Sequence, residues 1–159
     1  MKSSLVGVLA GLLVACGFHL QGADTLPEVM SSIYIETPDP YSGFYRGIQR
    51  SLRTSGATLL KVRNDTSAVL IIHEDQTGRR VLSVSPRNIP EEFEVYYQVR
   101  YSVQAGGDVL IEPQTVSLSR DFTYDETKVL AKAEEEEVIR QALASDIVRM
   151  VRRRIASLQ

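Results

Sequence analysis

Few side chains in this sequence could carry out catalysis. Its 159 residues contain two histidines, His19 and His73, and one cysteine, Cys16, for which another use is argued next. No zinc site or Cys-His pair can be assembled from the rest, and no glycine-rich phosphate loop or hydrolase motif occurs. The carboxylates at residues 91–92 and 134–137 are more typical of solvated surface than of a catalytic pair. We predict a protein that is not an enzyme and needs no metal or other cofactor.

Cys16 lies in a setting that indicates lipid modification. Lys2 precedes an apolar stretch over residues 5–14, and the small residue Ala15 stands directly before the cysteine. This arrangement is typical of a secretory signal, and the stretch is too short to span a bilayer. The Leu-Val-Ala-Cys sequence resembles the lipobox of bacterial lipoproteins, in which the cysteine is acylated and becomes the first residue. The alternative is an ordinary signal peptide followed by a free thiol.

The domain organisation follows from that processing. We predict a signal peptide over residues 1–15, a lipidated tether over 16–30 and a single α+β domain over 31–159. A lone cysteine allows no disulfide, so the domain must be stabilised by packing. The net charge of −2 argues against a dedicated nucleic-acid binder. No second apolar segment of about 20 residues is available to cross a membrane.

Hydrophobic periodicity predicts the elements. Tyr41 to Leu52 and Val129 to Leu158 show helical spacing, the second with an apolar stripe that includes Met150. The strongest alternation, residues 93–103, predicts a strand with one buried face. Further strands are predicted over residues 32–37, 68–73, 80–85 and 109–122, the last with a bulge or edge at Pro113. Turns are predicted at Thr77-Gly78 and, for a hairpin, at 105–108.

These elements predict an α+β fold, a two-layer sandwich in which two helices cover one face of a mainly antiparallel sheet of four or slightly more strands. Glutamates at 134–137 and arginines at 149–154 lie near opposite ends of the long helix, which suits the helix dipole and a solvated surface. His73 ends an apolar strand and is expected in the core or at an edge, with one ring nitrogen hydrogen-bonded.

Two motifs carry a family resemblance. Cys16 is followed by Gly-Phe-His-Leu, and residues 122–136 contain aromatics, an acidic turn and a Leu-Ala-Lys-x-x-Glu helix start. Together with the lipobox, these resemble the LptE family of lipopolysaccharide-assembly lipoproteins of Gram-negative outer membranes. The resemblance implies a lipid-anchored protein facing the periplasm, which plugs the β-barrel LptD in a one-to-one complex and binds lipopolysaccharide. Gly17 in place of the aspartate that retains lipoproteins at the inner membrane also points to the outer membrane.

Three cations are candidate lipopolysaccharide contacts. By resemblance, Lys132 matches a lysine associated with lipopolysaccharide binding, and it stands where helix amides also favour anions. Arg87 matches the family's loop arginine less well, because Pro86 and residues 89–90 depart from the family pattern. Charge-assisted hydrogen bonds from such cations suit phosphates and acidic sugars.

Arg120 is the third candidate. It interrupts the alternation of Val116, Leu118 and Phe122, so its guanidinium is directed to the same face as the core residues. A buried arginine without a partner would be costly. Arg120 therefore either forms an internal ion pair or lies at the end of the sheet facing a ligand.

Two other functions are compatible with parts of this pattern. A periplasmic lipoprotein could scaffold another envelope complex without contacting lipopolysaccharide. An envelope hydrolase is disfavoured by the missing catalytic groups. Co-purification with a large β-barrel would separate the first alternative from the function that the resemblance implies.

Overall fold

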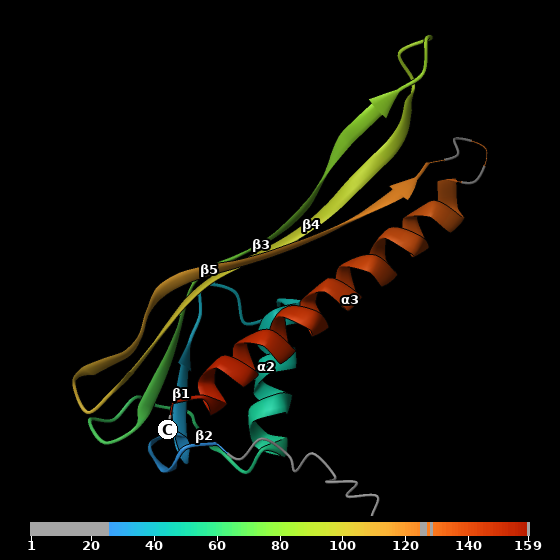
Figure 1. The fold of residues 1–159 in the computed structure, drawn as a ribbon. Helices are drawn as coiled ribbons and strands as arrows, with labels where there is room; N and C mark the ends of the chain where they lie inside the picture. The colour runs from blue at the N-terminus through green and yellow to red at the C-terminus, as the bar shows by residue number, and fades with distance from the viewer. Residues whose placement is uncertain (1–25, 125–126, 128, 159) are drawn as a thin grey trace, which may run out of the picture.

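The computed structural model describes residues 26–124, 127 and 129–158, so Cys16 and the predicted signal peptide lie outside the described residues. A five-stranded sheet carries two helices on one face (Figure 1). Its strand order is β2-β1-β3-β4-β5. In chain order, the elements are the 3₁₀ turn η2 (Glu28–Met30), β1 (Ser32–Glu36), α2 (Gly43–Thr54), β2 (Thr58–Leu60), β3 (Ala68–Val84), β4 (Pro90–Ala105), β5 (Asp108–Thr123) and α3 (Val129–Ala156).

The sheet is mixed, and its three long strands are antiparallel. β3 pairs with β4 and β4 with β5 in antiparallel fashion, whereas β1 pairs in parallel with both β2 and β3. The connection from β1 to β2 passes through α2, as a parallel pair requires. The predicted α+β fold is confirmed. The three-residue β2 was not predicted, because so short an edge strand carries no periodicity.

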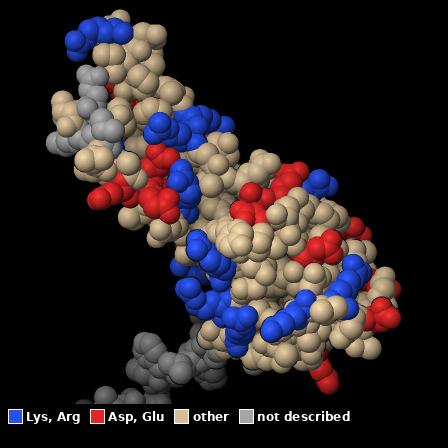
Figure 2. Space-filling model, turned by 180° about the vertical axis from the view of Figure 1, so that it is seen from behind, with Lys and Arg blue, Asp and Glu red and all other residues tan. Residues whose placement is uncertain are grey.

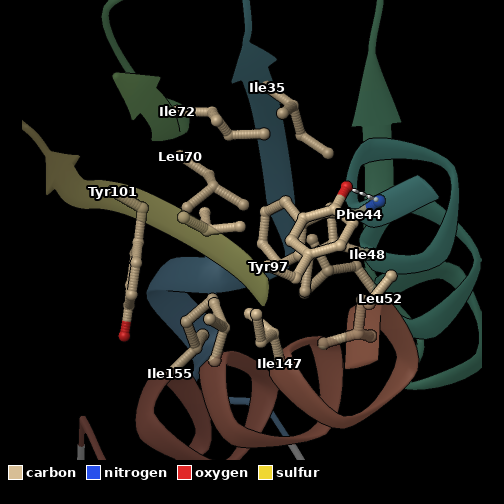
Figure 3. Packing of buried hydrophobic residues seen from close by; sticks show 14 of the residues in the cluster. Ile35, Phe44, Ile48, Leu52, Leu70, Ile72, Tyr97, Tyr101, Ile147 and Ile155 are labelled. Atoms are coloured by element: carbon tan, nitrogen blue, oxygen red, sulfur yellow. Dashed lines mark hydrogen bonds between the residues drawn. The ribbon is translucent and has the colours of Figure 1, made fainter. Parts of the chain in front are cut away.

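The hydrophobic core lies between the helices and the sheet, as Figure 3 shows. Six helical side chains in it have no measurable exposure: Phe44, Ile48 and Leu52 of α2 and Ile147, Val151 and Ile155 of α3. Met150, predicted in the same stripe, is 42 % exposed. The buried side of this part of α3 includes Ala144 and Val148, and Met150 projects from the opposite flank.

The predicted turn at Thr77-Gly78 is wrong, because β3 continues as one strand from Ala68 to Val84. Gly78 pairs with Tyr96 of β4. A Cβ atom at Gly78 would lie 2.7 Å from the Tyr96 hydroxyl oxygen. The glycine thus makes room for the aromatic side chain of the neighbouring strand. A glycine in the sequence can therefore mark such a close contact within a strand as well as a turn.

Two predictions about the β4–β5 hairpin are confirmed. Gly106 and Gly107 adopt positive φ angles of 60° and 92° in the turn, which glycine tolerates without steric strain. The ladder moves from the pair Tyr101–Gln114 to the pair Val103–Ile111. The bulge that this shift marks contains Pro113, on a strand at the edge of the sheet.

The β3–β4 hairpin projects beyond the rest of the molecule. β5 reaches only the pair Glu92–Thr123, so the last part of the hairpin has two strands. Figure 1 shows it extending past the end of β5 and the start of α3. We call residues 79–93 the hairpin arm. Val81, Leu82 and Val84 on it are 47 to 50 % exposed.

Candidate binding surface

Lys132 lies in the first turn of α3, over the ring of Phe122 in β5. Its Nζ atom is 6.0 Å from the ring centroid and 2.7 Å from Glu135 Oε2. Its side chain is only 19 % exposed. The ring and Glu135 cover part of the chain, and the aromatic face favours the ammonium group.

Three aromatic rings form the base under this lysine. Phe93 and Phe122 are directly opposite each other on β4 and β5, with centroids 5.9 Å apart and planes at 23°. Tyr124 meets Phe93 edge-on, with centroids 5.3 Å apart. Such cross-strand aromatic pairs stabilise sheet pairing beyond simple burial. The rings of Phe93 and Phe122 form the apolar surface over which the side chains of Arg79 and Lys132 lie.

Arg79 completes the group from β3. Its guanidinium carbon is 4.8 Å from the Phe93 ring centroid, and its Nη1 is 2.9 Å from Glu136 Oε2. The other oxygen of Glu136 lies 2.6 Å from Arg140 Nη2. We call Arg79, Phe93, Phe122 and Lys132 the cation–aromatic patch. Sequence reasoning missed Arg79, since its contact with Glu136 spans 57 residues.

The glutamate run therefore does more than solvate the helix. Glu136 is only 13 % exposed and pairs with arginines of β3 and α3, and Glu135 pairs with Lys132. The first turn of α3 contains no acidic residue. Because the favourable interaction of carboxylates with the helix dipole fades beyond the first turn, the expectation that the glutamate run suits the dipole is wrong. The run connects α3 to the sheet through one ion pair, that of Glu136 with Arg79.

Arg120 lies on the helix-bearing face, as predicted, because it pairs with the buried Val95. It is nevertheless exposed, since β5 is an edge strand. In the part of the chain that the structure describes, no carboxylate pairs with it, so the first of the two predicted alternatives, an internal ion pair, is not found. Arg120 stands two residues before Phe122, beside the cation–aromatic patch.

Arg87 lies in the loop at the tip of the hairpin arm and is exposed. The loop is held by hydrogen bonds from the Ser85 amide to the Ile89 carbonyl and from the Asn88 amide to the Ser85 carbonyl, both 2.8 Å. Figure 1 shows this tip well away from the start of α3. The structure thus brings Lys132 and Arg120 to one region and holds Arg87 apart from them.

An ion pair on the opposite face of the sheet strengthens the base of the arm. Arg80 pairs with Glu94, which is 9 % exposed. Hydrogen bonds from Arg80 and, to a smaller extent, from Ser119 lower the pKa of Glu94 below its ordinary value of 4.5. The carboxylate is therefore held in its charged form between β3 and β5.

His73 and the acidic side chains add no catalytic or metal-binding group to this surface in the described part of the chain. His73 lies within β3, the central strand, at an irregularity of the ladder and exposed, so the expected core or edge position is wrong; the predicted hydrogen bond is present, with Nε2 2.9 Å from Ser102 Oγ. Within the described ranges, no group of three His, Cys, Asp or Glu side chains could hold a metal ion. No described helix is long and apolar enough to cross a membrane.

Comparison with known proteins decides the family. The family model named LptE, described as lipopolysaccharide-assembly, matches residues 30–155. The chain belongs to the LptE family. The LPS-assembly lipoprotein LptE of Yersinia enterocolitica is 28 % identical over 161 residues, covering 98 % of this chain and 77 % of that protein. The LptE of Pectobacterium atrosepticum is 25 % identical, covering 99 % and 88 %.

Solved structures agree with this LptE fold. The solution structure of a lipoprotein B from Nitrosomonas europaea has a TM-score of 0.72 and 26 % identity, covering 89 % of this chain and 91 % of that one. The crystal structure of the rare lipoprotein B from Shewanella oneidensis has a TM-score of 0.69 and 23 % identity, covering 79 % and 94 %. The second likeness supports the fold alone.

Proposed function

We propose that this chain is an outer-membrane lipoprotein of lipopolysaccharide assembly, anchored by lipid on Cys16, that plugs and supports the LptD β-barrel and binds lipopolysaccharide. The match of the LptE family model over residues 30–155 carries the proposal. The relatives named LPS-assembly lipoprotein support the same process. The role is binding and scaffolding, with no covalent chemistry.

Co-purification tests the partner. A tag at the C-terminus of the full chain, used on solubilised outer membranes, should recover a large β-barrel in a one-to-one complex. Recovery of a different envelope complex, without a barrel and without lipopolysaccharide, would replace this proposal with the scaffold function.

The anchor is tested at Cys16. Acyl chains contribute about 0.8 kcal/mol per buried CH₂, and stable anchoring needs more than one chain. Cys16→Ala should therefore give an unprocessed or soluble periplasmic form. The N-terminal peptide of the wild-type chain should carry a fatty-acid mass and begin at Cys16. A soluble wild-type chain without that mass would contradict the anchor.

The lipopolysaccharide contacts are assigned to Lys132, Arg120 and Arg87. The patch offers partly desolvated cations beside aromatic rings, which suits a ligand with both phosphates and apolar chains. Lys132 is already bonded to Glu135, so a phosphate would have to replace or share that carboxylate. Arg120 and Arg87 have no such competitor among the residues described.

Lys132→Asp combined with Arg87→Asp should weaken lipopolysaccharide binding, more strongly at low salt, where repulsion is less screened. The thermal transition should stay within a few degrees of wild type, because Arg87 is exposed and Lys132 forms a single i,i+3 ion pair, of a kind that contributes about 0.2–0.5 kcal/mol. The matched control is Lys61→Asp with Arg53→Asp, which makes the same charge change at exposed positions elsewhere. Equal binding by both double variants across a salt series would remove these residues from the site. Unfolding of the first variant would indicate a structural role.

A further inference from the structure

A groove of about 670 Å³ lies between α2 and α3, away from the tip of the arm. Residues 42–54 form one wall, residues 137–148 the other, and Asp75, Thr77 and Tyr97 of the sheet close one side. Its volume is in the range of small-molecule sites. None of Lys132, Arg120 and Arg87 lines it.

Two glycines of α2 bring the helices together beside this groove. A Cβ atom at Gly43 would lie 3.4 Å from Ala144 Cβ, and one at Gly47 would lie 2.9 Å from Val148 Cγ2. The backbone of α2 therefore contacts side chains of α3 directly. The groove wall is well defined, because its helices are held by close packing rather than by long, mobile side chains.

Arg46 and Arg50 extend into this space without a partner. Both are exposed, and neither forms an ion pair with any described carboxylate. Residues four apart lie on one helix face, where like charges destabilise the helix. In Figure 2, Lys and Arg side chains gather on the broad part of the molecule, below a group of Asp and Glu. The two arginines thus lie on one face of α2 with no direct ion pair to a described carboxylate.

The carboxylates near them are engaged elsewhere. Glu137 Oε2 lies 3.0 Å from Arg140 Nη1, and Asp39 Oδ1 accepts a 2.8 Å hydrogen bond from the Tyr41 amide. These acids are satisfied by neighbours of their own. They leave the guanidinium groups of α2 available to a bound anion.

Asp75, the third acid, is held at the closed side. It accepts hydrogen bonds from the hydroxyls of Ser42 and Tyr97. Ser42 also caps α2 by accepting from the Tyr45 amide at 2.9 Å, and the Tyr97 hydroxyl accepts from the Phe44 amide at 3.1 Å (Figure 3). Burial raises the pKa of Asp75 above its ordinary value, and its carboxylate is turned toward these two hydroxyls.

The other lining groups define the ligand class. Ser51 and Ser145 present hydroxyls, and Ala144 and Val148 present apolar carbon. Gln141 presents its amide oxygen, since its amide nitrogen donates to Glu137 Oε1 at 2.9 Å. Two guanidinium forks suit the oxygens of a phosphate. Hydroxyls beside apolar carbon suit a sugar ring, which has hydroxyl edges and C–H faces.

We propose that this groove binds a phosphorylated sugar, with its phosphate between Arg46 and Arg50 and its ring toward Ser145 and Gln141. The inference does not depend on the proposed function, because it uses none of the residues assigned there. It adds a second anion site to the molecule.

Phosphorus NMR titration of glucose 1-phosphate with the full chain, in a detergent free of phosphate, tests the site. The wild-type chain should give a saturable shift. Arg46→Gln with Arg50→Gln should weaken binding at least about tenfold, because two charge-assisted contacts are lost. The matched control is Arg53→Gln, an exposed arginine of the same helix that does not line the groove, and it should bind within about twofold of wild type.

Inorganic phosphate and uncharged glucose test the two halves of the ligand. Phosphate alone should bind more weakly than glucose 1-phosphate, and glucose added as a competitor should not displace the bound glucose 1-phosphate. Ser145→Ala should weaken the binding of glucose 1-phosphate and leave the binding of inorganic phosphate unchanged. Equal loss in the Arg53 control, equal affinity for phosphate and sugar phosphate, or preference for an acidic peptide over both would overturn the proposal.

Discussion

The two ends of the sheet are built differently. At the body, β1, β2 and the first part of β3 lie under both helices, and side chains such as Ile33, Leu70 and Ile147 have no measurable exposure. At the hairpin arm, only the start of α3 approaches the sheet, and aliphatic side chains such as Leu82 stay about half exposed. The body is stabilised by burial, and the arm by cross-strand pairs and ion pairs.

This difference separates stability from binding. Burying an aliphatic or aromatic side chain contributes about 1.5 to 3 kcal/mol, whereas exposed ion pairs contribute about 1 kcal/mol or less. Charges on the arm can therefore be exchanged with little effect on folding. Arg79 and Arg87 lie on the arm, and Lys132 lies beside it at the start of α3.

The largest expected effect is in the body. Phe44→Ala removes a fully buried ring of α2 and should lower the free energy of unfolding by about 3–5 kcal/mol. Urea unfolding followed by circular dichroism measures it. Val84→Ala on the arm should change stability by less than about 0.5 kcal/mol. Equal losses at both positions would break the comparison.

A smaller effect is expected where the helices touch. Gly47→Ala places a methyl group 2.9 Å from Val148 Cγ2 and should destabilise the protein by about 1–2 kcal/mol. Val148→Ala in the same chain should recover part of that loss. Gly43→Ala is the matched control, since its Cβ would lie at an ordinary 3.4 Å from Ala144. If Gly43→Ala destabilised the protein as much as Gly47→Ala, the close contact with Val148 would not be the cause.

At the base of the arm, Phe93→Leu should reduce stability by about 0.5–1.5 kcal/mol, because it removes the stacking with Phe122 and Tyr124. Hydrogen exchange should locate the effect. Amides of residues 79–93 should exchange faster, while those of α2 and β1 keep their protection. Uniform acceleration across the molecule would show that body and arm unfold as one unit.

The smallest effect concerns pH. The pKa of Glu94 is lower in the folded state than its ordinary value of 4.5, so the folded state binds fewer protons there than the unfolded chain. Its contribution to stability is present above about pH 4.5 and is lost as the pH falls through the lower folded value. Glu94→Gln and Arg80→Gln should both flatten this acid loss in thermal melts below that pH. An unchanged acid profile would show that the pair does not support the arm.

Local patterns explain how much could be predicted. The alternation from Phe93 to Val103 and the glycine pair at 106–107 identified β4 and the turn that follows it, because period and turn chemistry are properties of neighbouring residues. Gly78 misled the prediction, since a glycine signals either a turn or a close cross-strand neighbour. Only the register, which places Tyr96 opposite, distinguishes them.

Sequence by itself determined the α+β class, the two helices and their buried stripes, the edge position of Pro113 and the face on which Arg120 lies. Tertiary structure alone decided which side chains meet across elements: Arg79 with Glu136, Lys132 with the ring of Phe122, and Arg46 and Arg50 with the groove between the helices. The reason is physical. Periodicity assigns a side chain to a face of its own element, whereas its partners depend on strand register and on where the helices cross the sheet.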